Sequence, residues 1–193
     1  MQKRSEAFGL TLDNIPIINL RNEFARYYNA LKDDRFLSQF GGGLDRPIKT
    51  PYMIWYGMDD DLITIILQRA ILGIESYLSG AVYFELGMKS QLKNNIHLLK
   101  NPFDLGGRGT VENFYHRLPA LVDEKNSLKS FSQDLFQKTV LFYKEVRNPV
   151  FHGHNISGGN IRGLRRVFDF LAEVYAWIDS WHNLSEIFSP KKP

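Results

Sequence analysis

The amino-acid sequence predicts an all-α protein, a helical bundle with an additional N-terminal helix and loops. Apolar residues recur at intervals of three and four along most of the chain, which is the period of a helix. One stretch is apolar almost all round, as expected for the central helix of a bundle. No convincing strand pair, internal repeat or low-complexity tract interrupts this pattern.

The length and composition predict a single domain covering residues 1–193. Hydrophobic residues make up 44% of the 193 positions and aromatic residues 13%, which is enough for one sizeable core. No shift in composition marks a second domain. We expect flexible ends at residues 1–17 and 186–193.

Two helices joined by a loop are expected in the N-terminal half. Apolar spacing predicts the first helix over residues 18–32, and a loop rich in Gly and Pro follows it. Asp59, Asp60 and Asp61 then provide an N-cap and acidic residues that favour a helix start. These residues begin the helix that is apolar almost all round, which is expected over roughly residues 60–79.

Polar residues form one narrow stripe along that apolar helix. Because each helical residue advances about 100°, the stripe contains Thr64, Gln68, Glu75 and Ser79. Glu75 is its only charge beyond the first turn. Buried carboxylates are rarely without a partner, so we expect Glu75 to hydrogen-bond Arg147 and orient it, or to satisfy another buried polar group.

Apolar residues in the C-terminal half have the same helical spacing. Pro119 is expected to kink one helix, and Ser130 with Gln133 has the spacing of a capping box. The expected helices cover residues 84–99, 111–122, 131–146 and 161–178, and the expected loops cover residues 101–109 and 153–159.

Charge and cysteine content limit the possible partners and compartments. The formal net charge is +3, which permits an anionic partner without requiring one. The absence of cysteine excludes disulfides, thiol catalysis and thiolate metal sites, and it suits a reducing cytosol. No charge-free run approaches the roughly 20 apolar residues of a membrane helix. We therefore expect a soluble, cytoplasmic protein with no membrane partner.

Residues 147–153 are the most informative stretch, because an arginine and a histidine are separated there by four residues. Arg147 continues a largely apolar stripe, so we expect it to be partly buried and to bind an anion. In one regular helix His152 would lie about 140° away around the axis. Asn148 and Pro149 are expected to break the helix and bring both side chains to one cleft. Alternatively, copies from two subunits converge across a two-fold axis.

An arginine and a histidine in one cleft suit cleavage of RNA without a metal. Histidine exchanges protons near neutral pH, and the guanidinium group binds phosphate oxygens. A base would activate the ribose 2′-OH for attack on the adjacent phosphate, whereas DNA lacks that hydroxyl. The competing interpretation is structural, with Arg147 compensating a helix C-terminus and Asn148 and Pro149 forming a turn.

The pattern of Arg147, Asn148, three residues and then His152 resembles the Arg-x(4–6)-His signature of the HEPN superfamily. In that superfamily a polar residue, often Asn, follows the arginine, and the signature lies just before the last long helix. The acidic start of the apolar helix and the pair Ile74-Glu75 resemble the abortive-infection (Abi-like) branch.

This resemblance covers mainly residues 60–182 and implies a HEPN-like helical bundle that forms a homodimer with a composite cleft. It implies a metal-independent endoribonuclease, an RNA-binding hydrolase that acts as a toxin or antiphage effector and needs no cofactor. Arg147 and His152 would be the essential pair, and Asn148 would position the substrate or the motif. RNA would be the substrate, and an antitoxin protein or a nucleotide is a further expected partner. A non-catalytic HEPN-like module that binds a nucleotide or a protein is the alternative, and a plain helical interaction protein is the third interpretation.

Four further residues near the motif are candidates for substrate binding. Arg162, Arg165 and Arg166 would extend a phosphate-binding surface, or they are basic residues of a solvated helix face. His154 is the fourth candidate. His152 and His154 also form a weak candidate for a metal site, but no third ligand follows at a recognisable spacing, so no metal is expected.

Two glycine-rich segments, residues 41–43 and 106–110, superficially resemble phosphate-binding loops. Neither ends in the Gly-Lys-Ser/Thr sequence after a strand, so we interpret both as turns. The remaining histidines, His97, His116 and His182, are expected to be ordinary surface or core-edge residues.

Overall fold

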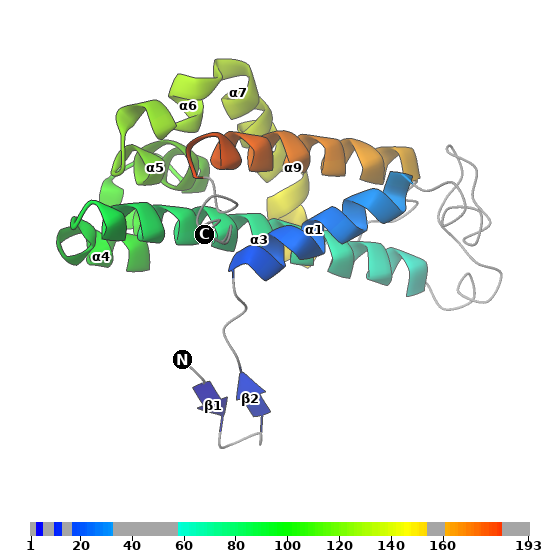
Figure 1. Ribbon diagram of the computed structural model, residues 1–193. Helices are drawn as coiled ribbons and strands as arrows, with labels where there is room; N and C mark the ends of the chain where they lie inside the picture. The colour runs from blue at the N-terminus through cyan, green and yellow to red at the C-terminus, as the bar shows by residue number, and fades with distance from the viewer. Residues whose placement is uncertain (1–2, 6–9, 13–16, 33–57, 154–160, 183–193) are drawn as a thin grey trace, which may run out of the picture.

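Helices form almost all of the part of the chain that the computed structural model describes, which comprises residues 3–5, 10–12, 17–32, 58–153 and 161–182 (Figure 1). The all-α class that the sequence predicts is therefore confirmed. One short antiparallel strand pair, β1 (Lys3–Ser5) with β2 (Leu10–Leu12), is present although the sequence pattern indicates none. Three-residue strands are too short to show a recognisable alternation. The other residues of the ends expected to be flexible, up to residue 16 and from residue 186, lie outside the described ranges.

Most helical segments appear near the positions that the apolar spacing predicts. The single helix expected over residues 84–99 is wrong, because residues 84–88 continue the central helix and residues 89–91 separate them from a helix that begins at Leu92. In chain order they are α1 (Ile17–Lys32), α3 (Met58–Met88), α4 (Leu92–Lys100), η1 (Pro102–Leu105), η2 (Glu112–Arg117), α5 (Leu118–Ala120), η3 (Glu124–Asn126), α6 (Leu128–Phe131), α7 (Gln133–Phe142), η4 (Tyr143–Arg147), α8 (Asn148–Phe151) and α9 (Ile161–Trp181). The segments η1 and η3 are 3-10 turns, whereas η2 and η4 are π-helical turns.

The central helix α3 is longer than the sequence predicts. It continues past the expected end near residue 79, because Ala81 and Val82 are fully buried and their packing outweighs the poor helix propensity of Gly80. It ends just before Ser90, whose φ of 59° leaves the helical region.

The start of α7 is capped by Ser132 instead of Ser130. The Ser132 backbone is extended, and its Oγ accepts a hydrogen bond of 3.1 Å from the Leu135 N–H. Ser130 lies inside α6, so the capping box expected at Ser130 and Gln133 is wrong.

Each π-helical turn directly precedes a short α-helical segment that contains a proline, Pro119 in α5 and Pro149 in α8. Proline has no N–H and its ring clashes with the carbonyl four residues earlier, and the wider π turn relieves both constraints. Asn148 keeps helical angles, with φ of −64° and ψ of −48°. The helix break expected at Asn148 and Pro149 is therefore wrong, and η4 continues directly into α8.

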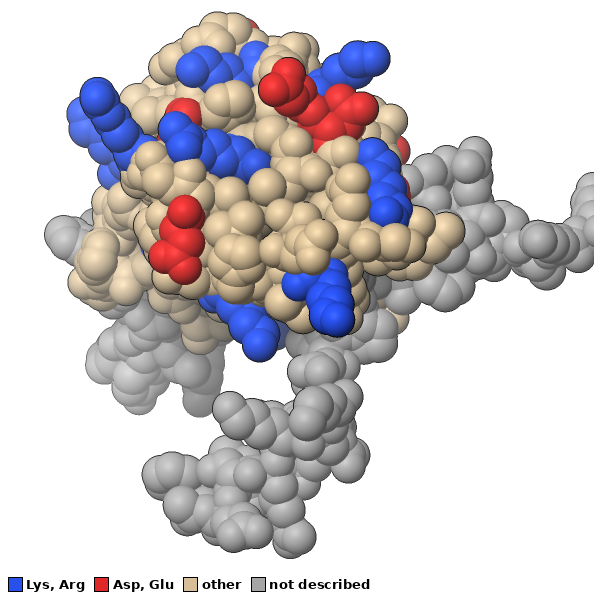
Figure 2. Space-filling view, turned by 90° about the vertical axis from the view of Figure 1, so that its left-hand side faces the viewer, with Lys and Arg blue, Asp and Glu red and all other residues tan. Residues whose placement is uncertain are grey.

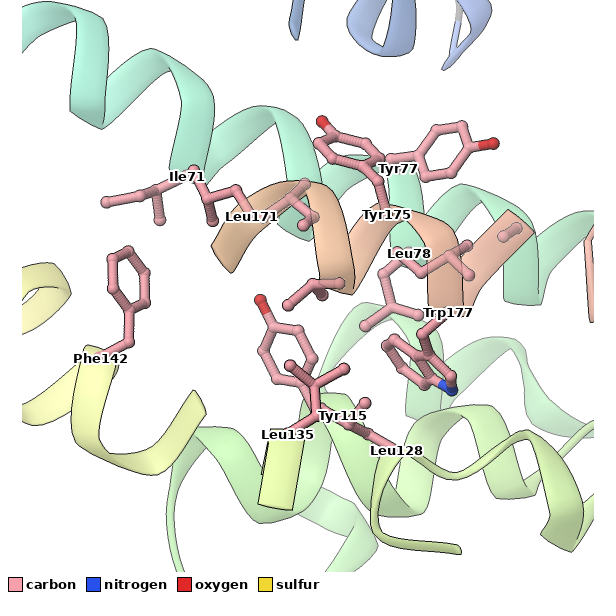
Figure 3. Packing of buried hydrophobic residues seen from close by; sticks show 14 of the residues in the cluster. Ile71, Tyr77, Leu78, Tyr115, Leu128, Leu135, Phe142, Leu171, Tyr175 and Trp177 are labelled. Carbon is pink, nitrogen blue, oxygen red and sulfur yellow. The ribbon is translucent and has the colours of Figure 1, made fainter. Parts of the chain in front are cut away.

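The core lies between α3 and α9, which run side by side, with α1 packed against both (Figure 1). Figure 3 shows large aromatic side chains at its centre, and Tyr77, Tyr115, Tyr175 and Trp177 are almost fully buried. The Trp177 Nε1–H donates a hydrogen bond of 3.0 Å to the Asn126 carbonyl, which ties α9 to η3. Burial of these rings fixes the position of α3, which carries the polar stripe.

Over Thr64–Met88, α3 is long and apolar enough to cross a membrane by length and composition. Half of this stretch is buried against the other helices. The core helix of a soluble protein has the same composition, and the packing of α3 is consistent with that class.

Candidate functional site

Arg147 is held at the edge of the core by contacts on several sides. Its Nε donates a hydrogen bond of 3.2 Å to Glu75 Oε1, and its guanidinium carbon lies 4.6 Å from the ring centre of Phe151. Nη1 lies 3.5 Å from Asn148 Oδ1. The Arg147 side chain is 22% exposed, so its expected partial burial is confirmed, and Arg147 is one of the two kinds of partner expected for Glu75.

Glu75 connects Arg147 to a pair of buried tyrosines. The Tyr143 hydroxyl donates a hydrogen bond of 2.5 Å to Glu75 Oε1, and its oxygen lies 3.0 Å from the Tyr115 hydroxyl. Burial is the largest cause that raises the pKa of Tyr143 well above its usual value, and the neighbouring Tyr115 and the Glu75 carboxylate raise it further. The hydroxyl therefore stays protonated and remains a donor to the carboxylate at neutral pH.

The polar stripe of α3 faces the segment that carries the motif. Besides the Glu75 contacts, Gln68 Nε2 donates a hydrogen bond of 3.2 Å to the carbonyl of Val150. Thr64 is buried on the same side of the helix. The stripe thus attaches α3 to η4 and α8 and positions Arg147.

His152 is exposed and follows the last turn of α8. Its backbone N–H donates to the carbonyls of Asn148 and Pro149. No hydrogen bond or ion pair involves its side chain within the part of the chain that the structure describes. Because the helix continues through Asn148, the break that was expected to turn His152 toward Arg147 is absent from this segment.

The structure describes only some of the other residues that are expected to bind substrate. Arg165 is half-buried and Arg166 is exposed on α9. Arg162 belongs to the first turn of α9, but its side chain lies outside the described part, as does all of His154.

The remaining histidines differ in burial. His97 is exposed, whereas His116 Nδ1 lies 2.6 Å from Ser127 Oγ. His182 is fully buried and its Nδ1 lies 2.8 Å from Glu85 Oε1, so it belongs to the core.

A pocket of about 320 Å³ lies on the other side of Tyr143 and reaches Asn148. One wall comes from the loop and helix start between Arg108 and Glu112, and the other comes from α7, η4 and α8. Sequence patterns did not indicate this pocket, because its walls meet only through tertiary packing. Tyr143 itself had a signal, since it lies four residues before Arg147 on the same stripe.

Charges on the bundle end formed by α4, α5 and α6 are mixed. Figure 2 shows Lys and Arg side chains interspersed with Asp and Glu on this face, without one continuous basic patch. This face therefore has no extended track for a polyanion.

Two further searches, for a metal site and for similar known proteins, add nothing to this geometry. In the described ranges no group of three or more His, Asp or Glu side chains is arranged to hold a metal ion. No protein-family model matches the chain, and no curated protein or solved structure matches it at a significant level.

Proposed function

We propose that the protein is a metal-independent endoribonuclease of the HEPN type. The observation that carries the proposal is the fixed position of Arg147, half-buried between Glu75 and Phe151 at the end of a helix whose next turn leads to an exposed His152. The signature residues Arg147, Asn148 and His152 are the second support.

Arg147 would bind the scissile phosphate. Its Nε and one Nη1 proton face Glu75 and Asn148, and the Nη2 protons have no partner among the residues described. These donors remain for phosphate oxygens, and the fixed guanidinium group would stabilise the charge that develops during cleavage. Glu75 is a positioning residue in this scheme, because it contacts Arg147 and not the substrate.

His152 would act as the base. The neutral imidazole takes the proton of the ribose 2′-OH, the 2′ oxygen forms a bond to phosphorus, and the bond to the 5′ oxygen breaks. The leaving oxygen takes a proton from solvent. The products are a 2′,3′-cyclic phosphate and a 5′-hydroxyl end, and DNA is not a substrate because it lacks the 2′-OH.

The continuous helix favours a homodimer as the active form. His152 of one subunit would meet Arg147 of its partner, since one helix separates the two side chains by about 140° within a subunit. A cytoplasmic toxin or antiphage effector restrained by an antitoxin protein or a nucleotide is the biological role that fits such an enzyme.

A non-catalytic binding module is the second candidate. The specific observation in its favour is the Arg147–Glu75 ion pair, because a paired arginine needs no phosphate to satisfy its charge. In that case the same surface would bind a nucleotide or a protein without cleaving RNA.

One experiment separates the two candidates. The purified protein, its His152→Ala variant and the control His97→Ala are incubated with RNA and with DNA in EDTA, and the product ends are identified. We expect RNA fragments with cyclic phosphate ends from the wild type and from His97→Ala only. Uncut RNA, cleaved DNA or unchanged cleavage by His152→Ala would reject the nuclease.

A further inference from the structure

The glycine-rich loop at residues 106–110 has no role in the proposed cleavage, yet it is built to a fixed shape. The Gly107 N–H donates a hydrogen bond of 2.7 Å to Asn113 Oδ1, and Asn113 Nδ2 donates one of 3.3 Å to the Gly107 carbonyl. Asn113 is fully buried, so it clamps the loop to the start of the following helix. The loop thereby holds Arg108 in a defined place.

Glycine is required at two positions that flank Arg108. A Cβ atom at Gly107 would collide with Asn113 Oδ1, and Gly109 has a φ of 105°, a region that side chains rarely allow. Both glycines keep the loop close to η2 and direct the chain through Arg108 past the pocket. The turn that the sequence predicts at residues 106–110 thus also exposes the cationic side chain of Arg108.

The pocket beside this loop combines an apolar floor with cations on both walls. The exposed Val140 and the small accessible parts of the buried Phe136 and Tyr143 provide the apolar lining, and Arg108 and Lys144 are exposed on opposite walls. Its volume of about 320 Å³ is at the lower end of the range for small-molecule pockets. This size suits one flat, apolar group with an attached anion.

Two polar side chains, Thr110 and Asn148, add hydrogen-bonding groups to the pocket. The Asn148 Oδ1 faces Arg147 Nη1, so its Nδ2 protons remain as donors. The one acidic wall residue, Glu112, lies 3.7 Å from His116 Nε2 and 3.8 Å from Arg117 Nε, and these contacts offset part of its repulsion of an anion.

We propose that this pocket holds one nucleotide of the RNA substrate, with the base on Phe136, Val140 and Tyr143 and the phosphate between Arg108 and Lys144. The inference rests on the proposed function, whose site it extends. A nucleotide has both required parts, since its base is a flat aromatic group and its phosphate is an anion that cationic side chains bind.

The pocket is joined to Arg147 through a shared side chain. The Tyr143 ring lines the pocket, while the Tyr143 hydroxyl contacts Glu75, which holds Arg147. Asn148 lines the pocket and contacts Arg147 directly. A nucleotide in the pocket therefore lies next to the nucleotide whose phosphate Arg147 binds.

The test measures binding of probes that cannot be cleaved. Uridine 5′-monophosphate, inorganic phosphate and a 2′-O-methyl RNA trinucleotide are titrated separately into the full-length protein by calorimetry. Val140→Trp fills the pocket, and Leu141→Trp places the same side chain at an exposed neighbouring position outside it. The double variant Arg108→Ala/Lys144→Ala removes the cations, and Lys93→Ala is the control for an exposed lysine elsewhere.

We expect the monophosphate and the trinucleotide to bind about tenfold more weakly to Val140→Trp and to the double variant, as expected when one good contact is lost. Binding to Leu141→Trp and Lys93→Ala stays as in the wild type. Equal weakening by Leu141→Trp, unchanged binding by Val140→Trp, or phosphate that binds as tightly as the monophosphate would overturn the inference. Binding of the monophosphate without the trinucleotide would overturn the assignment to RNA.

The result of this binding test does not depend on whether the protein cleaves RNA. If nucleotides bind as expected but RNA stays intact, the pocket stands and the nuclease proposal fails. If RNA is cut through His152 but the probes do not bind, the nuclease proposal stands and the pocket inference fails.

Discussion

Arg147 and Glu75, 72 positions apart in sequence, are joined by a hydrogen bond of 3.2 Å from Arg147 Nε to Glu75 Oε1. The carboxylate comes from the central helix α3, and the guanidinium group comes from the π turn η4. Tyr143 donates to the same carboxylate oxygen. The core of the bundle thus sets the position of Arg147, the candidate phosphate-binding residue. That position depends on Glu75, which would not touch RNA.

Glu75→Gln is expected to lower the free energy of unfolding by about 1–3 kcal/mol, because it leaves the charge of Arg147 partly buried without its anion. Urea unfolding followed by circular dichroism measures this change. The matched control is Glu145→Gln on the same helical segment as Arg147, at an exposed position, with an expected change within about 0.5 kcal/mol. Equal changes for the two variants would show that the Arg147–Glu75 pair contributes no stability.

Alkaline pH is expected to destabilise the fold through its buried tyrosines. Burial is the largest cause that raises the pKa of Tyr77, Tyr115, Tyr143 and Tyr175 in the folded protein. An unfolded tyrosine ionises near pH 10, so above that pH the native state binds more protons than the unfolded state. Their contribution is fully present below about pH 10 and is lost as the pH rises toward the raised values.

Urea unfolding across this pH range checks the prediction. The free energy of unfolding should fall above about pH 10, by up to about 1.4 kcal/mol per pH unit for each tyrosine. Tyr143→Phe should reduce that slope, whereas Tyr83→Phe, at an exposed position, should not. A stability that is constant up to about pH 11 would contradict the assignment of buried, protonated tyrosines.

Two glycine-to-alanine substitutions are expected to have opposite effects on stability. Gly107→Ala forces a Cβ into Asn113 Oδ1 and should lower the melting temperature, with a cost of about 1–3 kcal/mol. Gly87→Ala meets only Leu92 Cδ2 at 4.0 Å near the end of α3 and should stabilise the helix by about 0.5–1 kcal/mol. Thermal unfolding of both variants measures the difference. A neutral Gly107→Ala would mean that the loop is not clamped as described.

Much of the fold and part of the site follow from local sequence patterns. The helical period located the bundle, and the polar stripe on an apolar helix indicated that Glu75 needed a partner. The place of Arg147 on an apolar stripe predicts its partial burial, which its 22% exposure confirms. These features were predictable because periodicity places residues on a common helix face, which is a local property.

Other features depend on tertiary packing and were not predictable. The sequence indicated a break at Pro149, but the helix continues because a π turn accommodates the proline ring. The apolar helix is expected to end near residue 79, yet the buried Ala81 and Val82 carry α3 on to Met88. The pocket lined by Arg108 and Lys144 is formed by segments more than 20 residues apart in sequence, and no short-range pattern indicates that they meet.

Mixing two inactive variants tests the composite site. We expect Arg147→Ala and His152→Ala, each inactive alone, to regain part of the RNA cleavage activity when subunits exchange, because one site of the mixed dimer then keeps both side chains. The readout is RNA cleavage by the mixture after refolding together, compared with each variant refolded alone. No recovery, despite mixed dimers seen by native mass spectrometry, would reject the arrangement across two subunits.

The most direct measurement is the single-turnover rate of RNA cleavage in EDTA by the wild type, Arg147→Ala, His152→Ala and the control His97→Ala. If Arg147 and His152 act on one phosphate, each of their variants slows cleavage by about 10²–10⁴-fold, the range for loss of a charge-stabilising donor or a proton-transfer group, and His97→Ala cleaves at the wild-type rate. Cleavage by Arg147→Ala or His152→Ala within about twofold of the wild-type rate, or no cleavage by the wild type, would contradict the account.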